Sequence, residues 1–416
     1  METILNLHLF DQYTQTTLLN STGNDLSAEM KTYYEKRLLD SAEPNLVHDQ
    51  FGTKYPIPKN GGKTIEFRKY SALGKALTPL TEGVTPAGNK LNVDTILATV
   101  DQYGDWIQIS DILDLTAIDR NVEQATRLLG AQAGRTLDTI TREVLMGGTN
   151  VQFAPSAAAL ATPIKRRVDL KGDCLLTIDA VLKAVAELRA MNAPTINGDY
   201  VGIIHPYVAA DLMRSEKWQD WHKYTTAEDM YNGEIGKIGG VRFVETTEAK
   251  IIGAGVIGDG INKLTVKTAI SSSSTSVVVN ETLTAVTPAK AIPIYIGGVA
   301  NTITKIEANS GGGSKITIGT AITAAAAGDA IYGAGATPSG ASVFCTLIVG
   351  AEAYGVTEVS GGGLQHIVKQ LGYGDDPLNQ RSSTGWKAIK TAERLSEEYM
   401  IRIEHCSDTG MYAKSN

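Results

Sequence analysis

The side chains in this sequence best suited to metal binding or nucleophilic catalysis are six histidines and three cysteines. His205 precedes Pro206 at an expected strand-to-helix turn, where a capping role is favoured over a catalytic or metal-binding one. His405 and Cys406 are neighbours in an expected strand, and such neighbours point to opposite faces, so joint metal ligation is disfavoured. The cysteines form no CxxC motif and no paired framework, which indicates a reducing compartment; they are Cys174, Cys345 and Cys406.

Motifs for phosphate, acyl-transfer and calcium chemistry give no positive signal. No GxGxxG follows an expected strand, and neither a phosphate-loop lysine motif nor GxSxG occurs. The glycine runs at 311–313 and 361–363 have no helix start or lysine after them, so we expect turns. Asp111, Asp114 and Asp119 lack calcium-loop spacing, and helix capping explains them better. We therefore predict no catalytic, cofactor-binding or metal-binding residue, and a protein that is not an enzyme.

The front third of the chain predicts a long extended hairpin. In residues 63–70, Ile65 and Phe67 alternate with polar residues, which is the period of a strand. Residues 91–111 form the expected return strand. The connection between them, 72–90, contains two prolines and three glycines and has no helical period.

Such a two-stranded ribbon is stable only if other parts of the protein or another molecule pack against it. Two isolated strands cannot bury both faces or pair their outer edges, so we expect another subunit to contact them. Basic residues around the ribbon could touch nucleic acid, but no aromatic residue except Tyr70 interleaves them, which favours salt bridges or a solvated edge. The predicted intersubunit contact residues are Lys63, Ile65, Phe67, Arg68, Tyr70, Lys75 and Trp106.

Residues 119–148 predict one long helix that organises the rest. Asp119 or Asn121 can cap its start, and Gly147 with Gly148 can end it. A helix of this length with one apolar stripe is typical of a beam that packs along a sheet. The stripe recurs at steps of three or four residues and consists of Val122, Ala125, Leu129, Ala133, Leu137, Ile140 and Val144.

Beyond this helix the pattern predicts a mixed domain of helices and strands. Thr177 caps a helix that runs to about Asn192, and Pro206 opens another through Met213. Strands are expected at 200–204, 241–245, 251–257, 343–349 and 364–368, while 386–389 and 399–404 are expected to form a closing pair.

Composition shifts to Thr, Ser, Ala, Val and Gly over residues 258–338. Six short strands at regular spacing predict a small all-β sandwich or barrel there. Glycine-rich stretches flank this module, and the apolar strand 343–349 follows it directly. The module is therefore expected to be nested in the surrounding domain.

The bulk composition is that of a folded, mildly acidic protein. The chain has 416 residues, 43% hydrophobic and 20% charged, with a formal net charge of −7. This balance argues against a protein that neutralises a nucleic-acid backbone, although not against one that surrounds nucleic acid. No signal peptide and no apolar run near the roughly 20 residues of a membrane span is seen, so we expect assembly in the cytosol.

The order of arm, long hairpin, long helix and α/β domain resembles the major capsid protein of tailed bacteriophages, the Hong Kong 97-type capsid fold. The likeness covers about 20–255 and resumes at 342–406, and 258–338 departs from it. The local sequence is similar to one branch of that family over 100–111, 130–142, 205–213 and 232–243.

The resemblance implies an α+β fold with six parts. These are an N-terminal arm, 1–50; an extended loop, 51–111; a peripheral domain with the spine helix, 112–200; the first part of an axial domain, 201–257; an inserted β-rich domain, 258–338; and the completion of both domains, 339–416.

The resemblance also implies a function. It is that of a structural coat protein that self-assembles through hexamers and pentamers into an icosahedral shell around double-stranded DNA, without sequence-specific binding. It implies a virion location after assembly in the host bacterial cytoplasm, portal and decoration proteins as further partners, no membrane and no cofactor. Some family members crosslink a lysine to a neighbour's asparagine, but no acid partner for that reaction can be placed here.

Two alternatives stay open at this point. One is an encapsulin-like nanocompartment shell that encloses an enzyme cargo, although a long ribbon and an inserted β-domain favour the virus. The other is a carbohydrate-binding protein whose module at 258–338 is the binder. The lack of any paired catalytic constellation counts against a hydrolase.

Overall fold

The computed structural model describes residues 46–416 apart from 57–62, parts of 71–87, 117–120, 158–162, 219–235, 272, 336, 358–363, 370–377 and 379. Residues 1–45 of the expected arm and the glycine run at 361–363 lie outside the described residues. Contacts divide the chain into two compact units: unit 1 is 1–147 with 352–396, and unit 2 is 148–351 with 397–416. Both mix helices and strands, so the predicted α+β class is confirmed.

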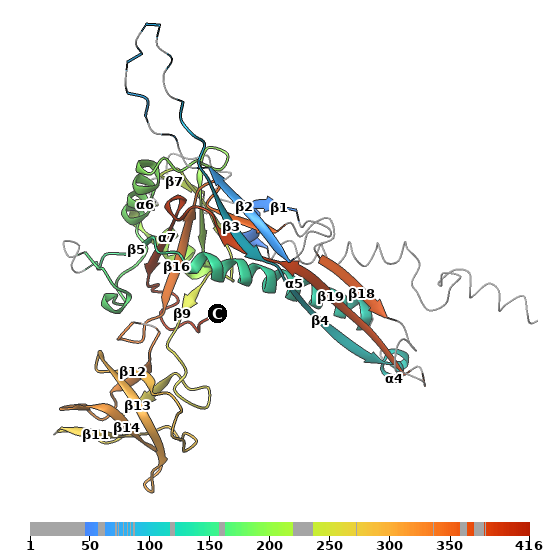
Figure 1. The fold of residues 1–416 in the computed structure, drawn as a ribbon. Coiled ribbons are helices and arrows are strands. Elements are labelled where there is room, and N and C mark those ends of the chain that lie inside the picture. Colours follow the sequence, from blue (N-terminus) through green and yellow to red (C-terminus); the bar gives the residue numbers. More distant parts are fainter. Residues whose placement is uncertain are drawn as a thin grey trace, which may run out of the picture. The chain divides into compact units, whose positions relative to one another are not determined.

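Unit 1 is built on the long helix α5, Asn121–Met146, within the range predicted from its apolar stripe. Within that stripe, Leu129, Ala133 and Leu137 are the most deeply buried residues. They pack on a three-stranded antiparallel sheet in the order β18 (Leu364–Lys369), β19 (Arg381–Lys390) and β4 (Asp101–Ser110) (Figure 1). Leu364, Trp386 and Ala388 supply the facing side of the sheet.

The extended hairpin of unit 1 is shorter than predicted. Strand β2 (Thr64–Tyr70) pairs with β3 (Val93–Thr99), as expected for the first part of the return. The return strand breaks at Val100, whose N–H donates to the carbonyl of Lys63 at 2.8 Å. The chain then continues as β4, which pairs with β19 over Asp101–Ser110. A single return over 91–111 was therefore wrong. Pairing with β19 supplies hydrogen-bond partners for β4 and lets Tyr103 pack against the cluster under α5.

A third small sheet completes unit 1. Its order is β1 (Thr53–Tyr55), β17 (Tyr354–Thr357) and β20 (Ala392–Arg394), with β1 parallel to β17. Two short helices, α3 (Val47–Gln50) and α4 (Asp111–Thr116), precede β1 and follow β4.

Unit 2 contains a seven-stranded sheet. Its hydrogen-bonded order is β5 (Val151–Phe153), β21 (Met400–His405), β16 (Val343–Val349), β6 (Tyr200–Ile204), β8 (Val241–Glu245) and β7 (Lys237–Ile238), with β9 (Ile251–Ile252) also paired to β16. The short 3₁₀ turns at Arg167–Asp169 and Glu397–Tyr399 connect parts of this unit. Strands β6 and β16 are buried along their whole length, as continuous apolar runs predict.

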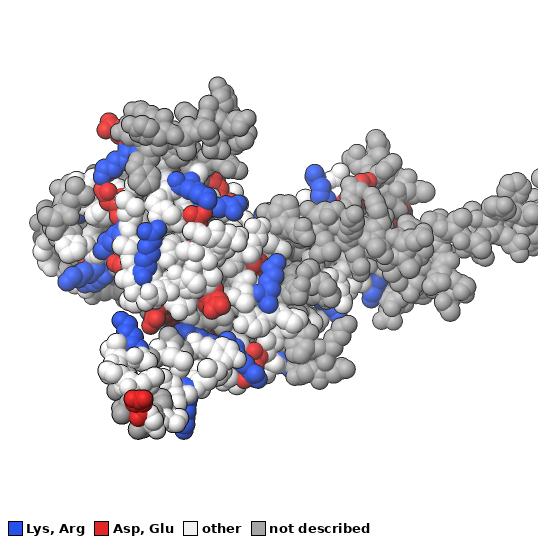
Figure 2. Space-filling model, turned by 90° about the horizontal axis from the view of Figure 1, so that it is seen from above, with Lys and Arg blue, Asp and Glu red and all other residues white. Residues whose placement is uncertain are grey.

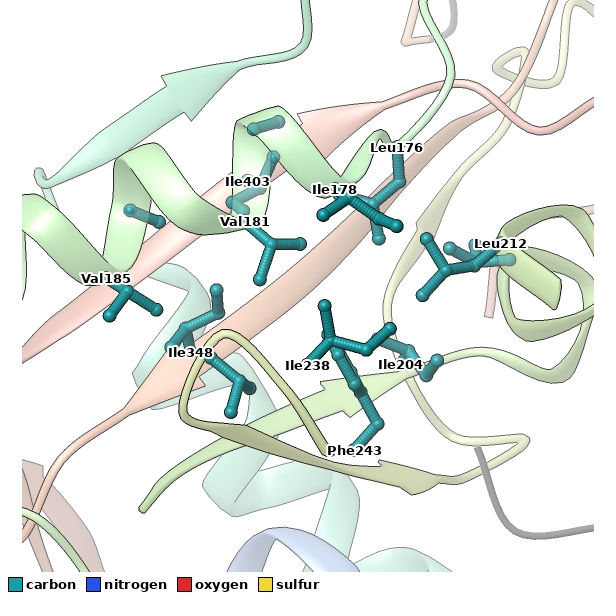
Figure 3. Close-up of a cluster of buried hydrophobic side chains, with 14 of the residues drawn as sticks. Leu176, Ile178, Val181, Val185, Ile204, Leu212, Ile238, Phe243, Ile348 and Ile403 are labelled. Atoms are coloured by element: carbon teal, nitrogen blue, oxygen red, sulfur yellow. The ribbon is translucent and has the colours of Figure 1, made fainter. Parts of the chain in front are cut away.

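Two of the predicted helices pack against this sheet. Helix α6 (Ile178–Ala190) begins at Thr177, whose hydroxyl accepts from the N–H of Ala180. Helix α7 (Pro206–Arg214) has proline in its first turn. Figure 3 shows the resulting core, in which Val181 and Val185 of α6 point toward Ile348 of β16 and Ile403 of β21.

The six strands expected within 258–338 all form, and they close into a barrel. They are β10 (Lys263–Thr265), β11 (Ser274–Val279), β12 (Ile292–Ile296), β13 (Val299–Ala308), β14 (Ser314–Ile322) and β15 (Ala330–Gly333), in the order β10-β15-β12-β13-β14-β11. A bridge between Val266 and Val279 joins the two edges, and Lys267 N–H donates to the Val278 carbonyl at 2.7 Å. Closure removes the exposed edges of the sheet and encloses an aliphatic core.

Two further predictions on the parent domain need correction. Residues 386–389 and 399–404 do not pair: the first segment belongs to β19 in unit 1, and the second to β21 in unit 2, which pairs with β16 and β5. Each segment has the residue pattern of an ordinary strand, and this pattern does not indicate which distant strand will be its partner. The strand expected at 251–257 is limited to Ile251–Ile252.

Candidate assembly surface

The base of the β2–β3 hairpin is fixed by side chains from its inner face. Ile65, Phe67 and Ala98 are buried together with Leu395 in one apolar cluster. The Phe67 ring, 0% exposed, meets the ring of Tyr55 edge-on, with centroids 4.7 Å apart. Of the predicted contact residues, Ile65 and Phe67 therefore lie in the core of their own unit, where they hold the hairpin in place.

The outer face and the loop end of the hairpin are exposed. Arg68 and Tyr70 lie on that face, and 61% of Tyr70 is accessible; Lys63, directly before β2, is also exposed. Arg68 approaches Glu66 at 3.5 Å, but both side chains are in solvent, so this pair adds little stability. The described part of the loop exposes Lys75 and a group of leucines, Leu73, Leu77, Leu80 and Leu91. Leucines this exposed are what a contact with a second molecule would cover.

A second exposed surface lies on the β18–β19–β4 sheet, on the face opposite α5. In one row across the sheet, Gly385 of β19 stands between Ile367 of β18 and Trp106 of β4. Because Gly385 has no side chain, the two apolar residues wall a hollow of about 670 Å³. Trp106 is 62% and Ile367 39% exposed. We call this hollow the trough.

Three cations line the trough. Lys387 and Arg381 lie on the central strand on either side of Gly385 and Ser383, and Lys369 stands beside Ser383 on β18. The nearby carboxylate of Asp105 belongs to the helix side, because its Oδ2 accepts from Nε2 of Gln132 in α5 at 2.6 Å. This hydrogen bond and one from the Trp106 N–H lower the pKa of Asp105.

A buried polar network fixes the start of the described chain on α5. The N–H of His48 donates to Oδ1 of Asp138 at 2.7 Å, and its ring Nδ1 lies 2.6 Å from Oδ2 of the same residue. Asp49 accepts from Oγ1 of Thr141 and from Nζ of Lys390, each at 2.5 Å. All five side chains are buried. Two ionisable pairs therefore attach helix α3 to α5 and β19, and they fix the position of the first described residues of the chain.

The histidines and cysteines considered first for chemistry have structural roles. Nδ1 of His205 accepts from the N–H of Tyr207 at 3.2 Å, the predicted cap. Nδ1 of His405 lies 2.9 Å from the carbonyl of Cys406, and Nε2 lies 2.8 Å from Oγ1 of Thr346. A carbonyl only accepts, so Nδ1 carries the proton and Nε2 accepts from the hydroxyl. Burial lowers the pKa of His405 to about 4, which keeps this ring neutral.

The thiols are equally enclosed. Cys174, Cys345 and Cys406 are free and buried. Burial raises the pKa of Cys345 and of Cys406 to about 12, far from the range of a reactive thiolate. Within the described ranges, no group of three or more His, Cys, Asp or Glu residues is arranged to hold a metal ion. None of the helices described is both long and apolar enough to cross a membrane.

Sequence reasoning identified some of this surface and missed the rest. It selected Trp106 but placed that residue on the hairpin, whereas the structure places it on the trough. It missed Ile367, Gly385 and Lys387, because only the pairing of β4, β18 and β19 brings them beside Trp106. On the face seen in Figure 2, positive and negative side chains are interspersed among the described residues, without a continuous basic footprint.

A comparison with known families gives one match, over the middle of the chain. Residues 93–278, which include β4, α5 and the first part of unit 2, match the model of a family described as phage capsid protein. The match covers somewhat less than half of the chain, and it agrees with the predicted resemblance to phage capsid proteins. A search of curated proteins gives no match.

Several solved capsid structures are similar to the chain at low identity. The capsid of cyanophage P-SCSP1u is 14% identical, with 94% of each chain covered and a TM-score of 0.49. The capsid of Ralstonia phage GP4 is 12% identical, with 84% of each chain covered and a TM-score of 0.49. That of cyanophage Pam1 is 11% identical, covers 83% of this chain and 86% of that chain, and has a TM-score of 0.49.

Proposed function

We propose that this coat protein assembles with copies of itself, through hexamers and pentamers, into an icosahedral shell that encloses double-stranded DNA without reading its sequence. The match of residues 93–278 to the phage capsid family carries this proposal. Assembly takes place in the host bacterial cytoplasm, and the finished protein resides in the virion. Portal and decoration proteins are the further partners that such a shell requires.

The exposed surfaces of unit 1 support assembly in physical terms. The β2–β3 hairpin leaves both of its outer edges without a strand neighbour in the described sheets, and its loop exposes leucines. Unpaired edges and apolar side chains are contact surfaces when a second molecule covers them. A subunit whose extended parts contact several neighbours distributes its interface over the shell, which closed symmetric assembly needs. Lys63, Arg68, Tyr70, Lys75 and Trp106 are the proposed exposed contact residues.

The parts of the chain receive roles accordingly. We assign residues 1–50 to an arm, 51–111 to an extended loop, and α5 to the spine of a peripheral domain that spans 112–200. Residues 201–257 and part of 339–416 form an axial domain, and the barrel within 258–338 is an inserted module. Hydrogen bonds from Gly255 N–H to the carbonyls of Gly333 and Ala334, at 3.2 and 3.0 Å, bring the two ends of this module together, as nesting requires.

Electron microscopy of the protein expressed alone tests the proposal. We expect closed particles of uniform diameter, from which image reconstruction gives fivefold and quasi-sixfold capsomers. A matched sample in which Tyr70 is changed to Asp should give fewer particles, whereas Lys183→Asp on the exposed side of α6 should not. Soluble monomers at concentrations where related shells form, with no particles in any sample, would refute the proposal.

A further inference from the structure

We propose that the trough binds a purine nucleoside triphosphate, with the base beside Trp106 and the phosphates at Lys369 and Arg381. The inference goes beyond the proposed function and does not depend on assembly. Its basis is the order of the side chains that the register of β4, β18 and β19 places on the exposed face of the sheet.

The apolar row of the trough forms a slot that fits a planar base. Trp106 and Ile367 stand on either side of Gly385. A Cβ at Gly385 would come within 2.7 Å of the Cβ of Trp106, so the floor between the two side chains is open only because this position is glycine. The exposed indole offers a face on which a base can stack, and such stacking is a main source of affinity for bases.

Along β19 the exposed face changes from apolar to polar to cationic. Ser383 follows Gly385 on this face, and Gln108 of β4 is paired with it. Their hydroxyl and amide groups can hydrogen-bond the hydroxyls of a ribose. Lys369 of β18 stands opposite Ser383, and Arg381 comes next on β19. Ammonium and guanidinium groups form charge-assisted hydrogen bonds with phosphate oxygens, so the strand presents partners for base, sugar and phosphates in that order.

The spacing of these groups matches the length of a nucleotide. Neighbouring residues on one face of a strand are roughly 7 Å apart, because each of the two residues between them rises about 3.3 Å. Ser383 is one such step from Gly385, and Arg381 is two steps away, roughly 13 Å. A base, a ribose and a chain of phosphates follow one another over a comparable distance. The hollow of about 670 Å³ also lies within the range of about 300–1,000 Å³ that small-molecule sites occupy.

The other end of the slot favours a purine. Lys387 lies on the far side of Gly385 from Ser383, where its ammonium can donate to N7, an acceptor that purines have and pyrimidines lack. Asp105 is the only carboxylate among the described residues that line the trough, and it is bonded to Gln132 on the α5 side. The trough is therefore suited to an anionic ligand that carries a purine.

The trough is already formed without a ligand. On the opposite face of β19, Trp386 and Ala388 pack against Leu129 and Leu137 of α5, so the sheet does not have to reorganise on binding. A subunit contact at Trp106 is compatible with a ligand beside it, because small-molecule sites occur preferentially where domains meet.

Other occupants fit the trough less well. A peptide strand binds to the edge of a sheet, whereas β19 is the central strand and is hydrogen-bonded on both sides. A nucleic-acid strand binds through several stacked bases, and among the described residues that line the trough only Trp106 presents an exposed ring. One ring accommodates one base, which favours a single nucleotide.

Photolabelling of the full-length protein locates the ligand. The protein is irradiated with 8-azido-GTP and digested, and the labelled peptides are identified by mass spectrometry. We expect labelled peptides from β4, β18 or β19, and loss of the label when excess GTP is present. Labelling confined to other peptides, or labelling that excess GTP does not reduce, would overturn the inference.

Equilibrium dialysis with GTP and with guanosine tests the chemistry of the site. Trp106→Ala should weaken GTP binding at least about tenfold, which corresponds to about 1.4 kcal/mol, whereas Trp106→Phe should retain most of the affinity. Lys369→Met and Arg381→Met should each weaken GTP binding about two- to fivefold and leave guanosine binding unchanged. Lys183→Met on α6 is the matched control and should change neither. Unaltered GTP binding by Trp106→Ala would contradict the proposal.

Two competitors separate a nucleotide from other anions. Inorganic triphosphate that displaces GTP as well as unlabelled GTP does would show a simple anion site and overturn the inference. A single-stranded decanucleotide that binds more tightly than GTP through the same residues would show that a nucleic-acid strand is the ligand, and would overturn it too. Neither measurement requires a shell, so failure of the unmodified protein to assemble would refute the proposed function alone.

Discussion

The attachment of α3 to α5 gives the sharpest energetic prediction, through the substitution Lys390→Met. Nζ of Lys390 lies 2.5 Å from Oδ2 of Asp49, and their side chains are 0% and 8% exposed. At an effective dielectric constant of about 20, the attraction over this distance is roughly 7 kcal/mol before desolvation is subtracted. Removing only the ammonium leaves a buried carboxylate with the Thr141 hydroxyl, and loss of one partner of a buried pair costs about 3–5 kcal/mol.

Hydrogen exchange measured by mass spectrometry can locate this loss of stability in the segment around α3. A local destabilisation of 3–5 kcal/mol accelerates exchange of the amides in 46–56 by roughly 100- to 5000-fold, because each 1.4 kcal/mol is tenfold. The matched control is Lys387→Met, three residues earlier on β19 and on the trough face, which should change exchange less than threefold.

The double variant Asp49→Ala with Lys390→Met separates the pair from simple packing. With both charges removed, no unpaired ion stays buried, so exchange in 46–56 should return most of the way toward the unmodified rate. A single variant that exchanges like the unmodified protein would refute the reasoning. So would a double variant that is less protected than the single one.

Three other predictions concern separate parts of the molecule. Because His405 has a pKa of about 4 when folded and about 6.5 when unfolded, its contribution to unit 2 is complete above pH 6.5 and is lost as the pH falls toward 4. Urea unfolding should therefore show a loss of about 3 kcal/mol between pH 7 and pH 4, and His405→Asn should flatten this slope; an equal slope in the variant would contradict it. Deletion of 72–90 should leave a soluble subunit that does not assemble, as judged by sedimentation, and normal yields of full shells would show that the loop is not a clamp. Replacement of 258–338 by a short Gly-Ser linker should leave the parent sheet folded by circular dichroism and exchange, because Gly255 and Gly333 already meet; collapse of that sheet would show that the barrel is integral.

Local periodicity predicted the elements of this fold well. The stripe through Leu129, Ala133 and Leu137 predicted α5, and the apolar runs at 200–204 and 343–349 predicted two buried strands. Short alternating stretches predicted all six strands of the barrel. In each case the chain neighbours of a residue determine its environment, so the pattern is visible without knowledge of the fold.

Strand pairing and side-chain contacts between segments that are distant in the sequence could not be predicted in the same way. Tyr103 pairs with Ala388 in one sheet although hundreds of residues separate them, and nothing within β4 indicates that partner. The same limit applies to the trough, since Gly385 becomes a floor only when Trp106 and Ile367 stand beside it. Lys390 and Asp49 read as ordinary surface charges in the sequence, and only the tertiary fold buries them together.

A cryo-electron microscopy reconstruction of particles formed by the protein alone tests the central claim most directly. The account predicts a closed icosahedral shell in which the loop between β2 and β3 lies against a neighbouring subunit. A protein that stays a compact monomer, or an assembly in which that loop contacts only solvent, would contradict it.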